Sequence, residues 1–146
     1  MDVQSILQLT SELLVASLHP MLQSLSLGSI AVTEGTLLRA LASWDGQLKR
    51  VTFHAVYLVD MEGNGWLDVL RTMATMPRLH ETRLYVLYMK SITHVRLYVD
   101  LRHVKHGQVG DFHVADHRTQ NSVVFRNRNE VTAGLRELLE GGLEYY

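Results

Sequence analysis

Apolar residues recur with one spacing in three segments of the chain, residues 22–32, 48–58 and 79–89. Each segment has apolar side chains at offsets 0, 3, 5, 8 and 10 from its first leucine, and Thr82 is the one exception. The alternation around offsets 3 to 5 predicts a short strand with one buried face. Offsets 8 and 10 predict that the chain turns inward again after this strand. The repetition predicts three similar structural units.

Segments with a helical period lie between these strands. Residues 33–44 and 66–76 each carry an apolar stripe with the period of an amphipathic helix, and a first helix is expected from Ser5 to Leu18. A helix that returns the chain between two strands makes those strands parallel neighbours. We therefore expect an α/β fold, a short leucine-rich-repeat-like solenoid with parallel strands. The alternative is a run of strand–helix units in an α/β sheet that is not a solenoid.

The spacing matches the leucine-rich repeat at all offsets but one. That repeat has Asn or Cys at offset 8, where this chain has Ile30, Val56 and Leu87. The segments begin 26 and 31 residues apart. These separations lie at or just above the usual repeat length of roughly 20–29 residues.

The chain after Lys90 is expected to cap the repeats. Its pattern predicts strands over 93–101, 109–115 and 122–126, and a helix over 130–140 that residues 129–132 cap and Gly141 ends. An array of repeats exposes the hydrophobic edge of its last unit, and covering that edge is the simplest role for this tail. The expected organisation is a single domain over 1–146, with repeat-like units in 1–89 and a capping region in 90–146.

Composition excludes several classes of protein. The 146 residues are 47% hydrophobic and include no cysteine, which excludes a disulfide framework, a thiolate metal site and a cysteine nucleophile. The net charge of −1 argues against a nucleic-acid partner, although residues 90–130 hold seven basic and four acidic side chains. The acidic start and short apolar runs predict no secretory signal and no membrane partner. An intracellular protein, cytoplasmic or nuclear, is therefore expected.

Part of the chain resembles a known family. The stretch from Leu48 to Asp60, followed by Gly65-Trp66 and by Met76 to Leu79, resembles the irregular leucine-rich repeats of F-box-like proteins, especially fungal ones. The resemblance covers about residues 22–89. Those families are adaptors, in which an F-box binds the ubiquitin-ligase scaffold and the repeats bind a client. Because this chain has no recognisable F-box, the resemblance implies client binding without ligase recruitment.

The residues between the buried strand positions are the candidate binding surface. In leucine-rich repeats these side chains point to the concave face, where partners usually bind. Strands stacked in register would place Arg50 beside Glu81 and His54 beside Tyr85. The alternative is a solvated sheet face on which Arg50 and Glu81 form a weak pair. The first unit supplies small residues, Ser24, Ser26 and Gly28, and the candidate binding residues are Arg50, Thr52, His54, Glu81, Arg83 and Tyr85.

A histidine-rich segment offers a different chemistry. Imidazole and carboxylate groups are good zinc ligands, but the spacing here matches no zinc motif, so neither a metal nor another cofactor is expected. The residues concerned are His103, His106, Asp111, His113 and His117.

Catalytic and calcium-binding motifs are missing from the sequence. Residues 60–71 resemble a calcium loop, but Arg71 stands where a bidentate glutamate is required, so a turn and a helix cap are expected there. The sequence contains no nucleophile elbow, no metalloprotease motif and no phosphate-binding glycine loop. The predicted function is a non-catalytic protein–protein interaction module, not an enzyme. The alternatives are a small metal-binding protein or enzyme that uses residues 103–117, and a truncated relic without activity.

Overall fold

The computed structural model describes residues 14, 19–59, 63–90, 96–100, 108–114, 117–141 and 144–145. Within these residues the chain forms two five-stranded sheets and three helices, so the fold is mixed α/β. The predicted class, α/β with parallel strands, is confirmed at this level.

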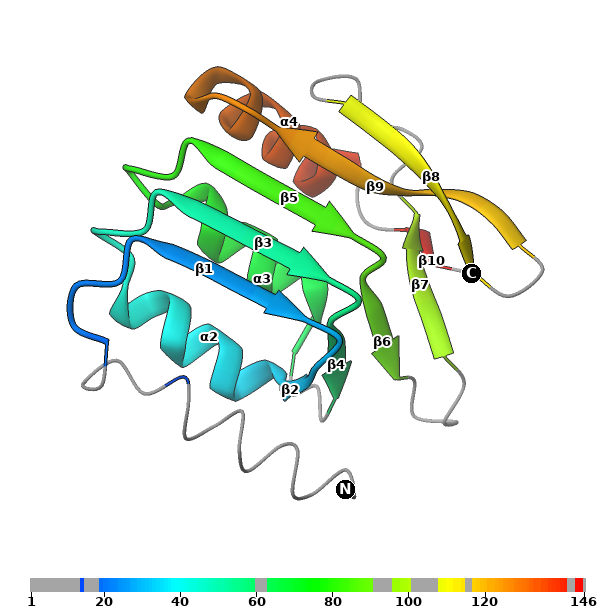
Figure 1. The fold of residues 1–146 in the computed structure, drawn as a ribbon, viewed down its shortest axis with the longest axis horizontal. Coiled ribbons are helices and arrows are strands. Elements are labelled where there is room, and N and C mark those ends of the chain that lie inside the picture. The colour runs from blue at the N-terminus through cyan, green and yellow to red at the C-terminus, as the bar shows by residue number, and fades with distance from the viewer. Residues whose placement is uncertain are drawn as a thin grey trace.

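The first sheet has the strand order β1-β3-β5-β9-β8 (Figure 1). β1, β3 and β5 run parallel, whereas β9 runs antiparallel to both β5 and β8. The three parallel strands cover offsets 3 and 5 of the repeated spacing, so the strands predicted there are confirmed. The members of this sheet are β1 (Ser24–Gly28), β3 (Arg50–His54), β5 (Glu81–Tyr85), β9 (His117–Phe125) and β8 (Gln108–Val114).

The second sheet has the strand order β10-β7-β6-β4-β2. β2, β4 and β6 run parallel, and each follows its partner in the first sheet after a two-residue break. The sequence predicted an inward turn at these offsets, and the structure forms a second short strand there. The members are β2 (Ala31–Thr33), β4 (Tyr57–Val59), β6 (Tyr88–Lys90), β7 (Arg96–Asp100) and β10 (Glu144–Tyr145).

The bend between the two strands has the same backbone geometry in each unit. Ser29, Ala55 and Val86 stand at the same offset and have φ angles of 50°, 54° and 53°. This left-handed region is unusual for residues other than glycine. The N–H of Ser29 donates to the carbonyl of His54, and the N–H of Ala55 donates to the carbonyl of Tyr85, both at 2.8 Å. The three sequence segments therefore adopt one local structure, joined by equivalent hydrogen bonds.

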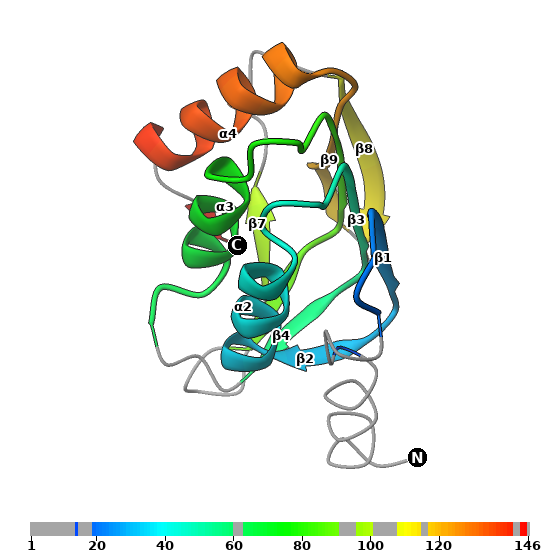
Figure 2. The same ribbon diagram turned by 90° about the vertical axis from the view of Figure 1, so that its left-hand side faces the viewer.

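Helices α2 (Glu34–Ser43), α3 (Trp66–Ala74) and α4 (Arg128–Gly141) lie on one side of the strands (Figure 2). α2 begins after Thr33, whose hydroxyl oxygen accepts a hydrogen bond from the Thr36 N–H at 3.1 Å. The helices predicted over 33–44 and 66–76 are confirmed to within two residues at each end. No helix in the described ranges is long and apolar enough to cross a membrane.

The cap of α4 differs from the prediction. The Asn127 side-chain oxygen accepts from the Glu130 N–H at 2.9 Å, and the Glu130 carboxylate accepts from the Arg126 N–H at 2.8 Å. Asn127 is therefore the N-cap residue and the helix begins at Arg128, so the cap predicted at residues 129–132 was wrong. The helix ends at Gly141, as predicted. The helix predicted from Ser5 to Leu18 lies outside the described residues except for Leu14, which is buried in the core.

The core lies between the helices and the strands. Phe53 and Trp66 pack with their ring centroids 5.6 Å apart, and the Trp66 indole N–H donates to the Tyr88 carbonyl at 2.7 Å. The residues at offsets 0 and 5 of the second and third units, Leu48, Phe53, Leu79 and Leu84, are all fully buried. The repeated spacing therefore supplies the buried layer.

The chain after Lys90 covers the edge of the third unit. β9 pairs with β5, and β7 pairs with β6, so both sheets continue beyond the repeats. Val123 and Phe125 of β9 are fully buried in the same core. The strands predicted over 93–101 and 109–115 are found as β7 and β8, whereas β9 begins at His117, earlier than the predicted residue 122.

Candidate functional site

The side chains of the first sheet alternate between the core and the face opposite the helices. In β3, Val51 and Phe53 are fully buried, while Arg50 and His54 are exposed. β5 follows the same alternation, with Leu84 buried and Arg83 exposed. We call the outward-facing residues of β3 and β5 the basic face: Arg50, Thr52, His54, Glu81, Arg83 and Tyr85.

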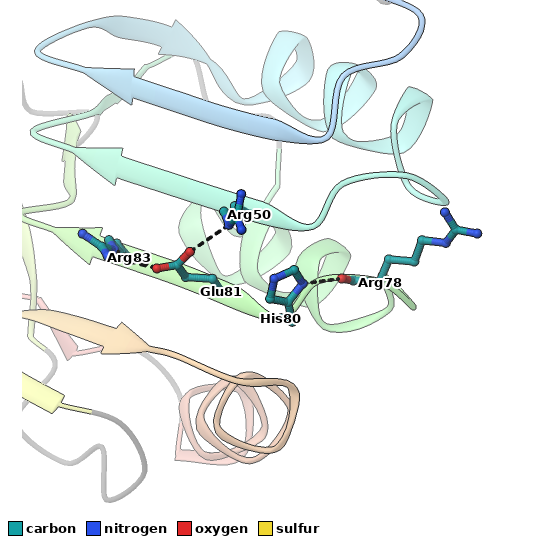
Figure 3. Close-up of polar contacts among 5 residues, drawn as sticks. All are labelled: Arg50, Arg78, His80, Glu81 and Arg83. Atoms are coloured by element: carbon teal, nitrogen blue, oxygen red, sulfur yellow. Dashed lines mark hydrogen bonds and ion pairs between the residues drawn. The ribbon is translucent and has the colours of Figure 1, made fainter.

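Glu81 lies between two arginines of the basic face and contacts both (Figure 3). Arg50 Nε lies 3.1 Å from one carboxylate oxygen, and Arg83 Nη2 lies 3.0 Å from the other. Arg83 Nε also donates to that second oxygen, at 3.2 Å. The predicted neighbours Arg50 and Glu81 are paired in the strand register and form this ion pair.

The electrostatics of this trio favour an anion. The side chains of Arg50 and Arg83 are 58% and 47% exposed, whereas that of Glu81 is 24% exposed. The hydrogen bonds and charge of Glu81 raise the pKa of the Arg83 guanidinium above its ordinary value. Two guanidinium groups around one carboxylate leave a net positive charge. A guanidinium presents several N–H groups, and both side chains are about half exposed, so N–H groups that Glu81 does not occupy remain accessible to a ligand.

His54 and Tyr85 form the second predicted pair. They are opposite each other in the register, and their rings meet edge to face with centroids 5.8 Å apart. Thr52 lies beside Arg83 in the same ladder. The arrangement places an aromatic pair directly beside the arginines, on the same face.

The first unit continues this face with small residues. Ser24, Ser26 and Gly28 are exposed and pair in register with Arg50, Thr52 and His54. Side chains therefore project only a short distance from the sheet along β1, and further along β3 and β5. On the far side of Arg83, the half-buried Val124 of β9 is its register partner.

Asp68 organises the start of α3. Its carboxylate accepts from the Asn64 N–H at 2.9 Å and pairs with Arg71 at 2.8 Å. The backbone hydrogen bond from Asn64 is the largest cause that lowers the pKa of Asp68 below its ordinary value of 3.8. The N–H of Gly63 donates to the buried Glu34 carboxylate at 3.0 Å. In the described residues this segment is a turn followed by the start of α3, whose N-cap is Gly65, so the predicted turn is found but no side chain of the N-cap residue caps the helix. Residues 60–62 lie outside the described residues.

The histidine-rich segment is only partly described. His103 and His106 lie outside the described residues, whereas His113 is in β8 and His117 is in β9. The register pairs His113 with Arg118 and His117 with Val114, so these two histidines stand on adjacent rungs of the ladder. Within the described part of the chain, no group of three or more His, Asp or Glu residues is placed to hold a metal ion.

Comparison of the chain with protein-family models, with curated proteins and with solved structures found no match.

A stacked tyrosine pair was missed by the sequence interpretation. Tyr57 and Tyr88 are register partners in β4 and β6, with ring centroids 5.1 Å apart and planes inclined by 15°. Both stand at offset 9 of the repeated spacing, between two apolar offsets. Comparing the variable offsets across the units would have identified them. They belong to the second sheet and are not part of the basic face.

An open depression of about 370 Å³ lies on the helix side of the molecule. It is separate from the basic face, because α2 and α3 line it. The lining residues are Ala42, Asp45, Arg71, Thr72 and Thr75.

Proposed function

We propose that this chain is a non-catalytic protein–protein interaction module built on leucine-rich repeats, and that it binds an intracellular partner through the basic face. One observation carries the proposal: in-register parallel strands hold Arg50, Arg83 and Tyr85 on one exposed face, with both arginines fixed by Glu81.

The repeat geometry supports the leucine-rich-repeat part of the proposal. The three units share the spacing of their apolar residues, the parallel register of their strands and a left-handed residue at the same offset. Such units cannot bury their hydrophobic surfaces alone, and they bind partners through the strand face of the array. The resemblance to the repeats of F-box-like adaptors favours a client-binding role, in which this chain is a fragment of such an adaptor.

The chemistry of the basic face suits a protein partner. Tyrosine and arginine are enriched at interface positions that contribute most of the binding energy. Arg83 is held by two hydrogen bonds to Glu81, and the Tyr85 ring is packed against His54. Side chains that are already fixed lose less conformational entropy on binding.

Site-directed photo-crosslinking tests this proposal. A photoreactive amino acid replaces Thr52 at the centre of the face in one variant, and Arg136 on α4 in a control. We expect one partner to cross-link from position 52 and not from position 136. The cross-link is expected to disappear when Arg83→Ala and Tyr85→Ala are added. Equal capture from both positions, or capture that survives the double substitution, would overturn the proposal.

A further inference from the structure

Two further arginines lie next to the strands that carry the Glu81 trio. Arg126 directly follows Phe125, which pairs with Thr82, and its side chain is exposed. Arg78 is also exposed, and its carbonyl lies 3.3 Å from His80 Nδ1, just before β5 (Figure 3). Among the described residues of the basic face, Glu81 is the one acidic side chain. The nearby Glu130 carboxylate accepts the Arg126 N–H in the cap of α4.

We propose that the partner presents an acidic peptide segment whose carboxylates bind Arg50 and Arg83. This inference rests on the proposed function and names the chemistry of its partner. A guanidinium fork matches the planar geometry of a carboxylate, and bonds between two charged groups are the stronger kind of hydrogen bond. Glu81 contacts Arg50 through Nε and Arg83 through Nε and Nη2, so an acidic side chain would meet the remaining Nη donors of the two groups.

The spacing of the arginines selects an extended peptide. Arg50 stands opposite Glu81, and Arg83 is two residues further along β5. One step across a sheet and two residues along a strand put their Cα atoms about 8 Å apart. Side chains two residues apart on one side of an extended peptide are separated by about 7 Å. Both guanidinium groups lie against the same Glu81 carboxylate, and glutamates at alternate positions of an extended peptide can reach one of them each.

The neighbouring surface leaves room for the peptide backbone. Ser24, Ser26 and Gly28 are exposed along β1 and project little from the sheet. A peptide whose acidic side chains reach Arg50 and Arg83 can lie over this low strip. A nucleic acid is a poorer match, because its phosphates need many basic contacts and the whole chain has a net charge of −1.

Fluorescence anisotropy with labelled peptides tests the inference on the full chain. The probe is a short serine peptide with glutamates at alternate positions, and its controls carry glutamine at those positions or the same glutamates side by side. We expect the alternating acidic peptide to bind most tightly, and its affinity to fall as salt is raised. Arg50→Gln and Arg83→Gln should each weaken binding about threefold to tenfold.

Arg136→Gln on α4 is the matched control and should leave peptide affinity unchanged. Equal binding of the glutamate and glutamine peptides would overturn the inference. So would tighter binding of a phosphoserine peptide or of a single-stranded oligonucleotide. If no peptide binds while a partner still cross-links from position 52, the inference of an acidic peptide segment is wrong and the proposed function stands. If both experiments fail, both proposals are wrong.

Discussion

Thr82 is the one polar residue at a buried offset of the repeated spacing. Its side chain is fully buried, and its hydroxyl oxygen has no hydrogen-bond partner within the described residues. Both register partners of Thr82 are apolar: Val51 in β3 on one side and Phe125 in β9 on the other. The site is thus an apolar layer that contains one unsatisfied hydroxyl.

We predict that Thr82→Val stabilises the protein by about 1–2 kcal/mol, because burying a hydroxyl without a partner is costly. The measurement is the free energy of unfolding in urea. Thr52→Val, on the half-exposed opposite face of the sheet, is the control and should change it by less than about 0.5 kcal/mol. A destabilised Thr82→Val variant would mean that the hydroxyl has a partner.

The carboxylate of Asp68 makes stability depend on acid pH. Hydrogen bonding from Asn64 lowers the folded-state pKa of Asp68 below the ordinary value of 3.8, so the unfolded chain binds this proton more readily. The stabilisation is therefore complete above pH 3.8 and is lost as the pH falls through the lower, folded-state pKa.

We predict that Asp68→Asn destabilises the protein by about 1 kcal/mol at neutral pH, and that this difference shrinks below the folded-state pKa. Urea unfolding at a series of pH values measures the effect. Asp45→Asn, just after α2, is the control and should not lower stability at neutral pH. A difference for Asp68→Asn that stayed constant down to the lowest pH would contradict the electrostatic origin.

At the scale of elements, α4 packs on β9 through a glycine. A Cβ atom at Gly134 would overlap the ring of Phe125, which is fully buried. We predict that Gly134→Ala destabilises the protein by about 1–2 kcal/mol, since overpacking outweighs the gain in helix propensity. Gly141→Ala is the matched control in the same helix, because a Cβ atom there meets nothing within 4 Å. Thermal unfolding of both variants checks the prediction, and equal melting temperatures would contradict it.

The strands and helices of the three units were predictable because their burial follows a simple period. Val51 and Phe53 alternate with exposed residues in β3, and the helical stripes mark α2 and α3. The register between β3 and β5 could be predicted from the same pattern, because aligning the repeated spacing places Arg50 beside Glu81, as the structure shows. The cap of α4 was not predictable in this way. Asn127 and Asn129 both precede the helical pattern, and the contacts of Arg128 with the third unit accompany the earlier start.

On the scale of the whole molecule, Arg128 joins the chain after Lys90 to the repeated units. Its Nη1 donates to the carbonyls of Met76 and Leu79, both at 2.8 Å, in the loop before β5. Both bonds span a long sequence separation and are partly buried. They connect α4 to the third unit in addition to the pairing of β9 with β5.

We predict that Arg128→Met destabilises the protein by about 2 kcal/mol, because two partly buried carbonyls lose a charged donor. The loss should appear as faster hydrogen exchange at the β5–β9 ladder, where Leu84 pairs with Val123, and less at the β1–β3 ladder. Arg136→Met, exposed on the same helix, is the control and should change neither measurement. Uniformly faster exchange across both ladders would instead mean that the repeats and the chain after Lys90 unfold as one cooperative unit.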